Sequence, residues 1–138
     1  MLVMKRDKFG EQYYTLIGGG IDPGETAEQA LLREVKEECG LDIAEPRLVF
    51  IDVAGDPFGD QYIYLCQYKG GEPQLDPASE EAAINTLGQN IHVPMWLPVR
   101  ELHKVSFRSE ELKKRLIEAL QMGFPAQAET FRSHFIRV

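Results

Sequence analysis

Three closely spaced glutamates, Glu34, Glu37 and Glu38, could together hold a metal ion. On a helix they project from neighbouring positions, because residues three and four apart share a face. Like charges at this spacing repel one another, and the helix dipole disfavours anions near the C-terminal end. A hard divalent cation would relieve the repulsion, and Mg²⁺ binds few carboxylates while leaving room for substrate phosphates. The alternative is a solvated acidic face, which is the commoner role of an isolated glutamate pair.

The helix that positions these carboxylates is predicted from its ends. Thr26 and Gln29 have the spacing of a capping box, and Gly40 stands where a left-handed C-terminal residue is expected. Between these ends, apolar residues recur at helical spacing: Ala27, Ala30, Leu31, Val35 and Cys39. We therefore expect an amphipathic helix that follows the glycine-rich turn at residues 18–20.

The stretch from Gly19 to Leu41 resembles the Nudix box. The residues at the defined positions of that motif are all present: Gly19, Glu25, Arg33-Glu34-Val35, Glu37-Glu38 and Gly40-Leu41. Seven of these nine positions take one fixed residue, and seven such residues, each with a frequency of roughly 7%, would coincide at a given start about once in 10⁸. The resemblance implies an α/β fold in which a mixed β-sheet is sandwiched between α-helices.

The resemblance also implies which residues act. In the family the box glutamates and the carbonyl before the box glycine ligate Mg²⁺ or Mn²⁺, which here gives four ligands: Glu34, Glu37, Glu38 and Gly18. Arg33 joins the three glutamates as a catalytic residue, and we expect it to orient a carboxylate through a bidentate pair. Glu25 is expected to compensate the helix dipole or to pair with Arg33 rather than to bind metal.

By resemblance, the reaction is hydrolysis of a pyrophosphate bond in a nucleoside diphosphate linked to another group. Charge spreads over phosphate oxygens in the transition state, so metal ions and positioning supply most of the catalysis. Nucleotide-sugars such as ADP-ribose and nucleoside triphosphates are both open as substrates. The alternatives are a non-catalytic nucleotide-sensing Nudix domain and a metal-stabilised interaction protein, but a sensor has no reason to retain three repelling carboxylates.

The sequence does not assign the general base. The family often recruits a glutamate from a late loop, commonly just before a tryptophan, yet residues 92–95 before Trp96 include no acid. Glu80 and Glu81 are the nearest candidates, although they could equally begin a solvated helix. Glu34 could act as the base instead.

Several other residues have two open interpretations. A nucleobase could stack on an aromatic residue, although aromatic residues in strands more often belong to the core; the candidates are Tyr13, Tyr14, Phe58 and Tyr62. Pro57 resembles a proline marker of ADP-ribose-hydrolysing relatives, but a turn there would favour proline anyway. The histidines lack partners at metal-ligand spacing, so we expect ordinary structural roles for them: His92, His103 and His134.

Composition describes one globular domain over residues 1–138. The chain is 43% hydrophobic and 27% charged, with a net charge of −7, which argues against nonspecific binding of nucleic acid. We expect a small nucleotide as partner, no nucleic acid and no membrane. Cys39 and Cys66 are interpreted as thiols rather than a disulfide, which suits a cytoplasmic location.

Outside the box, strands are expected at residues 2–5, 12–17, 47–53, 61–68 and 92–99, with a polar turn at 5–10 and helices at 79–85 and 108–122. The first strand of the Nudix fold has no counterpart, since Leu2–Arg6 resembles the second. We hypothesise that residues 131–138 of the tail (123–138) supply a strand in its place, within the chain or across a homodimer. A loose terminus is the alternative.

Overall fold

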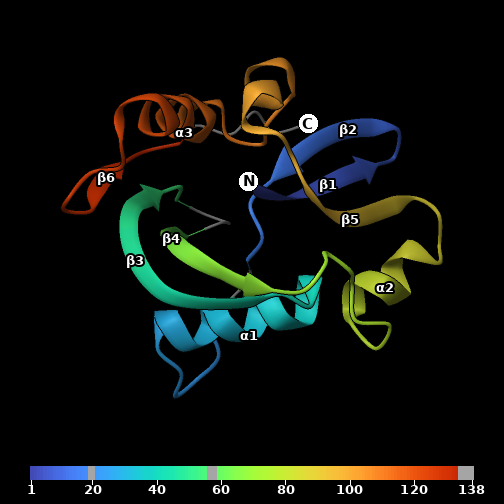
Figure 1. The fold of residues 1–138 in the computed structure, drawn as a ribbon. Helices are drawn as coiled ribbons and strands as arrows, with labels where there is room; N and C mark the ends of the chain where they lie inside the picture. Colours follow the sequence, from blue (N-terminus) through green and yellow to red (C-terminus); the bar gives the residue numbers. More distant parts are fainter. Residues whose placement is uncertain (19–20, 56–58, 134–138) are drawn as a thin grey trace.

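A computed structural model describes residues 1–18, 21–55 and 59–133 of the chain (Figure 1). The elements follow in the order β1 (Leu2–Lys8), β2 (Glu11–Thr15), α1 (Ala27–Cys39), β3 (Asp42–Val53), β4 (Asp60–Gly70), α2 (Glu80–Asn85), β5 (Asn90–Trp96), the 3₁₀ helix η1 (Val99–Lys104), α3 (Glu110–Met122) and β6 (Glu129–Phe131). The predictions for Gly19, Pro57, Phe58 and His134 lie outside the described residues.

The α/β fold is confirmed, with the described strands divided between two three-stranded sheets. In one sheet β1 lies between β2 and β5, and all pairs are antiparallel. In the other, β3 pairs antiparallel with β4 and parallel with β6, so this sheet is mixed. Figure 1 shows α1 and α3 on opposite sides of the strands, which is the expected sandwich. No helix in the described part of the chain is long and apolar enough to span a membrane.

Two apolar clusters hold these layers together. The larger cluster joins α3 to both sheets and includes Val3, Val49 and Leu116, all buried. The smaller cluster lies around the C-terminal half of α1, where Val35 and Cys39 are buried. The helix that carries the box glutamates is therefore fixed by its apolar face, as its periodicity predicted.

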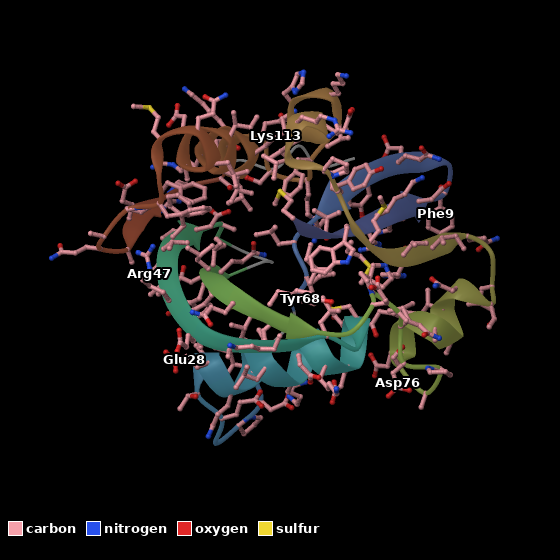
Figure 2. All side chains as sticks on the ribbon, in the orientation of Figure 1. Phe9, Glu28, Arg47, Tyr68, Asp76 and Lys113 are labelled. Atoms are coloured by element: carbon pink, nitrogen blue, oxygen red, sulfur yellow. The ribbon has the colours of Figure 1, made fainter. Side chains whose placement is uncertain are left out.

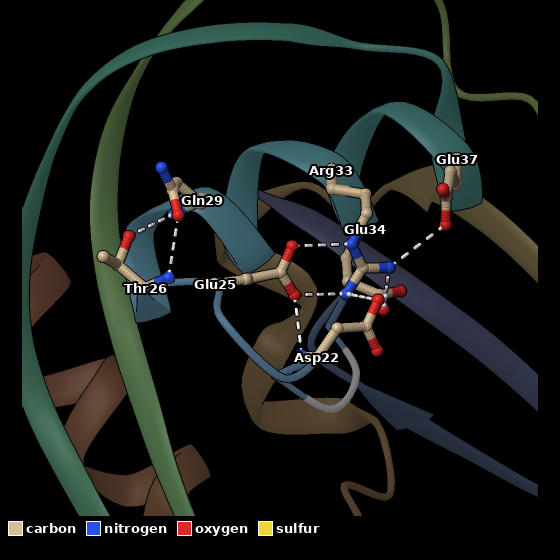
Figure 3. Close-up of polar contacts among 7 residues, drawn as sticks. All are labelled: Asp22, Glu25, Thr26, Gln29, Arg33, Glu34 and Glu37. Atoms are coloured by element: carbon tan, nitrogen blue, oxygen red, sulfur yellow. Dashed lines mark hydrogen bonds and ion pairs between the residues drawn. The ribbon is translucent and has the colours of Figure 1, made fainter.

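The predicted ends of α1 are confirmed. Thr26 Oγ1 accepts a hydrogen bond from the Gln29 amide at 3.1 Å, and Gln29 Oε1 accepts one from the Thr26 amide at 2.9 Å (Figure 3). Gly40 adopts a left-handed φ of 68° and donates its N–H to the Lys36 carbonyl. Both ends thus satisfy backbone groups that the helix itself leaves without partners.

Several predicted boundaries were wrong. The polar turn at 5–10 is instead strand as far as Lys8, because β1 pairs with β2 on one side and β5 on the other. The turn is confined to Phe9 and Gly10, which both have positive φ. β3 begins at Asp42 rather than at 47, and its pairing with β4 is interrupted by irregularities that a regular pattern does not predict.

The tail does contribute a strand, although not the one that was predicted. Glu129–Phe131 pair in parallel with Phe50, Ile51 and Asp52 of β3 in the same chain. Only Phe131 falls within the segment that was expected to form this strand, and residues 134–138 lie outside the described part. Homodimer formation stays a prediction.

The loop between β4 and α2 is attached to the C-terminal end of α1. The amide of Gln74 donates to the Cys39 carbonyl at 3.0 Å, and that of Asp76 donates to the Glu37 carbonyl at 3.2 Å. These carbonyls belong to the last turn of the helix, where intrahelical partners run out. The loop therefore fixes the start of α2 relative to the box helix.

We expect Gly71→Ala to destabilise the protein by about 2–3 kcal/mol, because the new side chain would collide with this helix end. A Cβ at Gly71 would lie 2.8 Å from the Gly40 carbonyl oxygen, and φ is +98°. Gly123 is a matched control, since its φ is +99° but a Cβ added there would meet no atom within 4 Å. Urea unfolding should show a smaller loss for Gly123→Ala, and equal losses would contradict the predicted collision.

Candidate active site

Arg33 is the centre of an ion-pair network at the start and middle of α1 (Figure 3). Its Nε and Nη2 donate to the two carboxylate oxygens of Glu25 at 2.9 and 2.8 Å, which is the expected bidentate pair. Glu25 also accepts from the Asp22 amide at 2.8 Å. The Arg33 hydrogen bond, with help from that amide, lowers the pKa of Glu25 to about 2. Glu25 thus binds the loop before the helix to Arg33.

The other side of the guanidinium faces two of the predicted metal ligands. Arg33 Nη1 lies 2.8 Å from Glu34 Oε1 and 3.3 Å from Glu37 Oε2. Hydrogen bonds to Glu25 and Glu34 raise the pKa of Arg33, so it stays cationic. Arg33 therefore balances part of the negative charge of the box and sets the orientation of its carboxylates.

Glu38 lies in a different environment, because its side chain is buried. The residue is 7% exposed, and its Oε2 accepts a hydrogen bond from the Gly18 amide at 3.2 Å. Burial raises the pKa of Glu38 to about 8, and the charge of Glu34 and a hydrogen bond with Glu34 add to the rise. Glu34 and Glu38 thus form a close carboxylate pair whose mutual repulsion a cation would relieve.

Glu81 is the late-loop acid that the structure brings to this pair. It lies in the first turn of α2, after the N-cap residue Ser79, and its charge also raises the pKa of Glu38. Glu81 lines the same cavity as Gly18, Glu34 and Glu38. The prediction that this segment begins a helix is confirmed. The role of Glu81 as base or ligand stays a prediction, which its place in the cavity favours.

The cavity has a volume of about 940 Å³ and opens between the two sheets. One part of its wall is acidic, formed by the carboxylates of Glu34, Glu38 and Glu81. Another part is aromatic, formed by Tyr62, Tyr64, Tyr68 and Trp96. A mostly apolar pocket with a few convergent polar groups is the usual form of a small-molecule site.

The donor chemistry of this wall fits a hard divalent cation. Carboxylate oxygens are the ligands that Mg²⁺ and Mn²⁺ prefer, and the Glu34–Glu38 pair concentrates negative charge that a cation would stabilise. Within the described residues, however, no cluster of three or more His, Cys, Asp or Glu side chains has a ready metal-binding arrangement. The carboxylates of Glu34 and Glu37 are held by Arg33. Metal ligation by Gly18, Glu34, Glu37 and Glu38 stays a prediction.

The remaining sequence candidates are distributed between core and cavity. Tyr14 packs against the larger core cluster, whereas Tyr62 is 44% exposed and lines the cavity. His92 is buried, and the Asn85 side chain hydrogen-bonds both its backbone N–H and its backbone carbonyl. These contacts indicate a structural role for His92. Cys39 and Cys66 are free thiols, as predicted, and burial raises the pKa of both to about 11.

Sequence reasoning missed Tyr68 and Trp96 as cavity residues. Tyr68 continues the alternation of Tyr62 and Tyr64 along β4, so its face could have been predicted. Its proximity to Trp96 could not, because these two residues belong to different sheets.

The raised pKa of Glu38 predicts how stability depends on pH without metal. Its folded value of about 8 exceeds the ordinary value of 4.5, so the folded state holds a proton that the unfolded state releases. The contribution of Glu38 to the free energy of unfolding is fully present below about pH 4.5. It decreases as the pH rises towards about 8. In chelator, Tm should fall by about 4 °C or more over that range, the shift that ~1 kcal/mol produces in a small domain.

The control for this pH effect is Glu38→Gln, which has no charge to ionise. Thermal melts of the variant in chelator should lack this part of the fall, and saturating Mg²⁺ should reduce it in the wild type. An identical pH dependence in both proteins would contradict the assignment to Glu38.

The family follows from comparison with known proteins. A family model described as "NUDIX domain" matches residues 1–120, so the chain belongs to the Nudix family. It is 48% identical to an RNA pyrophosphohydrolase of Erwinia tasmaniensis over 140 residues, covering 89% of this chain and 78% of that protein. It is 34% identical to an NAD-capped RNA hydrolase, NudC, of Stutzerimonas stutzeri over 85 residues, covering 60% of this chain. The chain spans only 30% of that NudC protein's length.

The fold comparison agrees with this family. An ADP-ribose pyrophosphatase from Streptococcus suis superposes with a TM-score of 0.62 at 20% sequence identity, covering 94% of this chain and 88% of that one. At this identity the likeness concerns the fold. It extends beyond the box to the strands and helices that surround the cavity.

Proposed function

We propose that this chain is a divalent-cation-dependent pyrophosphohydrolase that cleaves a nucleoside diphosphate linked to another group. The observation that carries the proposal is the close pair formed by half-buried Glu34 and buried Glu38, beside Glu81 in one cavity. The names of the relatives support the reaction, because RNA pyrophosphohydrolase, NAD-capped RNA hydrolase and ADP-ribose pyrophosphatase all describe pyrophosphate chemistry or nucleotide-linked substrates.

The cation would be held by Glu34, Glu37, Glu38 and the carbonyl of Gly18, and would polarise the pyrophosphate and offset its charge. Arg33 orients Glu34 and Glu37 through its ion pairs, while Glu25 fixes Arg33 in turn. Among the candidate bases, Glu81 is favoured over Glu80 because Glu81 lines the cavity. In this scheme Glu81 accepts the proton of the attacking water.

The substrate panel should contain ADP-ribose, NAD, nucleoside triphosphates and an RNA with a 5′-triphosphate. The net charge of −7 favours small nucleotides over nucleic acid, and the RNA tests this expectation directly. Release of phosphate, pyrophosphate or nucleoside monophosphate is measured with Mg²⁺, with Mn²⁺ and with chelator. The proposal predicts turnover of at least one member of the panel only when a divalent cation is present.

A nucleotide-sensing domain is the competing function, and the same panel distinguishes it. A sensor would show a rise of Tm with nucleotide but no product with any substrate. Glu81→Gln provides a further test, since a base that is removed should lower kcat without weakening binding of a product nucleotide. Unchanged kcat in this variant would show that Glu81 is not the general base.

A further inference from the structure

The outer edge of β4 is unpaired in the described part of the chain. Its backbone is hydrogen-bonded to β3 on one side, and among the described residues no backbone hydrogen bond joins β4 to a strand on the other side. The strand is 11 residues long, and residues 61–68 include neither a charged residue nor proline. Edge strands are usually short or carry charge or proline, because an open edge is a template for another strand. β4 therefore has the features of an edge that a further strand covers.

The cavity follows this edge. Its wall includes every residue from Asp60 to Cys66. Successive residues of a strand point to opposite faces of the sheet, so a cavity against one face would meet only alternate side chains. Contact with the whole run places the cavity along the edge of the strand. The part of the cavity that is lined by residues 60–66 is called the β4 groove.

Apolar helix faces cover the β4 groove on two sides. Leu31 and Val35 of α1 line the cavity, and so do Leu112 and Leu116 of α3. The two helices lie on opposite sides of the strands (Figure 1). A strand that continued the ladder of β6, β3 and β4 into the groove would therefore be buried on both faces. Strands in this situation are apolar at successive positions rather than at alternate ones.

Charge restricts what can flank such a strand. The acids of the cavity wall outnumber its arginines, which are Arg6 and Arg108, and the whole chain has a net charge of −7. Acidic residues beside the apolar centre of a docked segment would be repelled, whereas basic residues would be attracted.

We propose that the β4 groove is a docking site for an extended segment of a partner polypeptide, which pairs with the backbone of β4. The segment is apolar at its centre and basic at its ends. Addition of a strand to an open sheet edge is a general mode of peptide recognition, in which main-chain hydrogen bonds supply the affinity. The inference does not rest on the proposed function, because strand pairing requires only the backbone of β4 and the apolar walls of the groove.

The probe is the peptide Lys-Lys-Val-Ile-Val-Ile-Val-Lys-Lys, blocked at both ends. It is titrated into the full chain in chelator without nucleotide, so the result is independent of catalysis. We expect saturable binding, reported by the fluorescence of Trp96, which is the single tryptophan and lines the cavity. At about 100 times Kd the peptide should raise Tm by about 8 °C. Absence of binding up to ~1 mM peptide would overturn the proposal.

A second peptide separates strand pairing from apolar adhesion. In Lys-Lys-Val-Pro-Pro-Ile-Val-Lys-Lys, one of the two successive prolines faces β4 in any register, and proline has no N–H to donate. This peptide should bind at least about tenfold more weakly than the first. Equal affinities would show that the groove binds apolar peptides without strand pairing, and would overturn the proposal.

Leu65→Lys tests the groove from the side of the protein. Leu65 is 38% exposed and lines the groove, so a charge there would block the edge of β4 without entering the core. We expect the affinity for the first peptide to fall at least about tenfold. Val93→Lys is the matched control, because Val93 is 44% exposed on β5 and does not line the cavity. Equal peptide affinities in the two variants would overturn the proposal.

Light scattering without peptide tests whether a second copy of this chain is the occupant. We expect the same molar mass for the wild type and for Leu65→Lys. A dimer that Leu65→Lys dissociates and Val93→Lys does not would assign the groove to a second copy, and would overturn the proposal of a different partner.

Discussion

Glu38→Gln should lower kcat by about 10³-fold or more while leaving the protein at least as stable as the wild type. The expected loss has the size seen when a group essential to the chemistry is removed. Stability should hold because the buried carboxylate is repelled by Glu34 and Glu81, and burial also disfavours its charge. A neutral amide of the same shape removes both costs and can keep an acceptor for the Gly18 amide.

The matched control is Glu28→Gln on the same helix. Glu28 is exposed in the first turn of α1, away from the C-terminal end that carries Glu38 (Figure 2). Its replacement should change kcat by less than about twofold. Turnover and thermal melts at pH 8 in Mg²⁺ and in chelator check both variants. A variant with full activity would remove Glu38 from the mechanism, whereas a variant that fails to fold would contradict the charge argument.

The local parts of the site could be predicted because they depend on helical spacing. The capping pair Thr26–Gln29, the left-handed Gly40 and the Arg33–Glu25 contact involve residues at most eight apart. At this separation the geometry of one helix and its preceding turn determines which side chains contact one another. The box motif is specific enough to predict the Nudix family as well, and the match of the family model confirmed that prediction.

The non-local parts could not be predicted, because nothing local determines how the sheets are placed. Glu81 reaches Glu38 only because a loop binds the end of α1 through backbone amides, whose positions no side-chain pattern reveals. The contact of Tyr68 with Trp96 depends on the relative position of two sheet edges. The same limit explains the error in β1, since polar residues between Lys5 and Lys8 indicate a turn unless both flanking strands are known.

The packing of strand β6 in the tail is also non-local and could not be predicted from the sequence. It leads to a prediction of a large loss of stability. Phe131 ends β6 with 7% exposure, packs edge-on against Phe50 at 6.1 Å between centroids and lies under the guanidinium of Arg115 at 4.7 Å. Phe131→Ala should therefore cost about 3–5 kcal/mol, the usual loss for truncating a buried aromatic residue. Thr130→Ala, on the exposed side of the same strand, should change stability by less than about 0.5 kcal/mol. Urea unfolding compares the two, and similar small losses would mean that β6 contributes little.

A buried polar network next to Phe131 explains why the tail acts as part of the fold. Asp52 is fully buried on β3 and accepts from the Ser133 amide at 3.0 Å and from the Ser133 hydroxyl at 2.6 Å. Ser133 Oγ also lies 2.5 Å from Ser109 Oγ, the N-cap of α3. The network thus connects the tail to β3 and to the start of α3.

Ser133→Ala should lower the free energy of unfolding of the wild-type protein. The same substitution should lower it less in a protein that already carries Asp52→Ala. In the single variant a buried carboxylate loses a donor, whereas in the double variant both partners of that hydrogen bond are gone. A double-mutant cycle by urea unfolding should give a coupling of about 1–3 kcal/mol between these positions. Additive losses would show that the Asp52 carboxylate and the Ser133 hydroxyl contribute independently to stability.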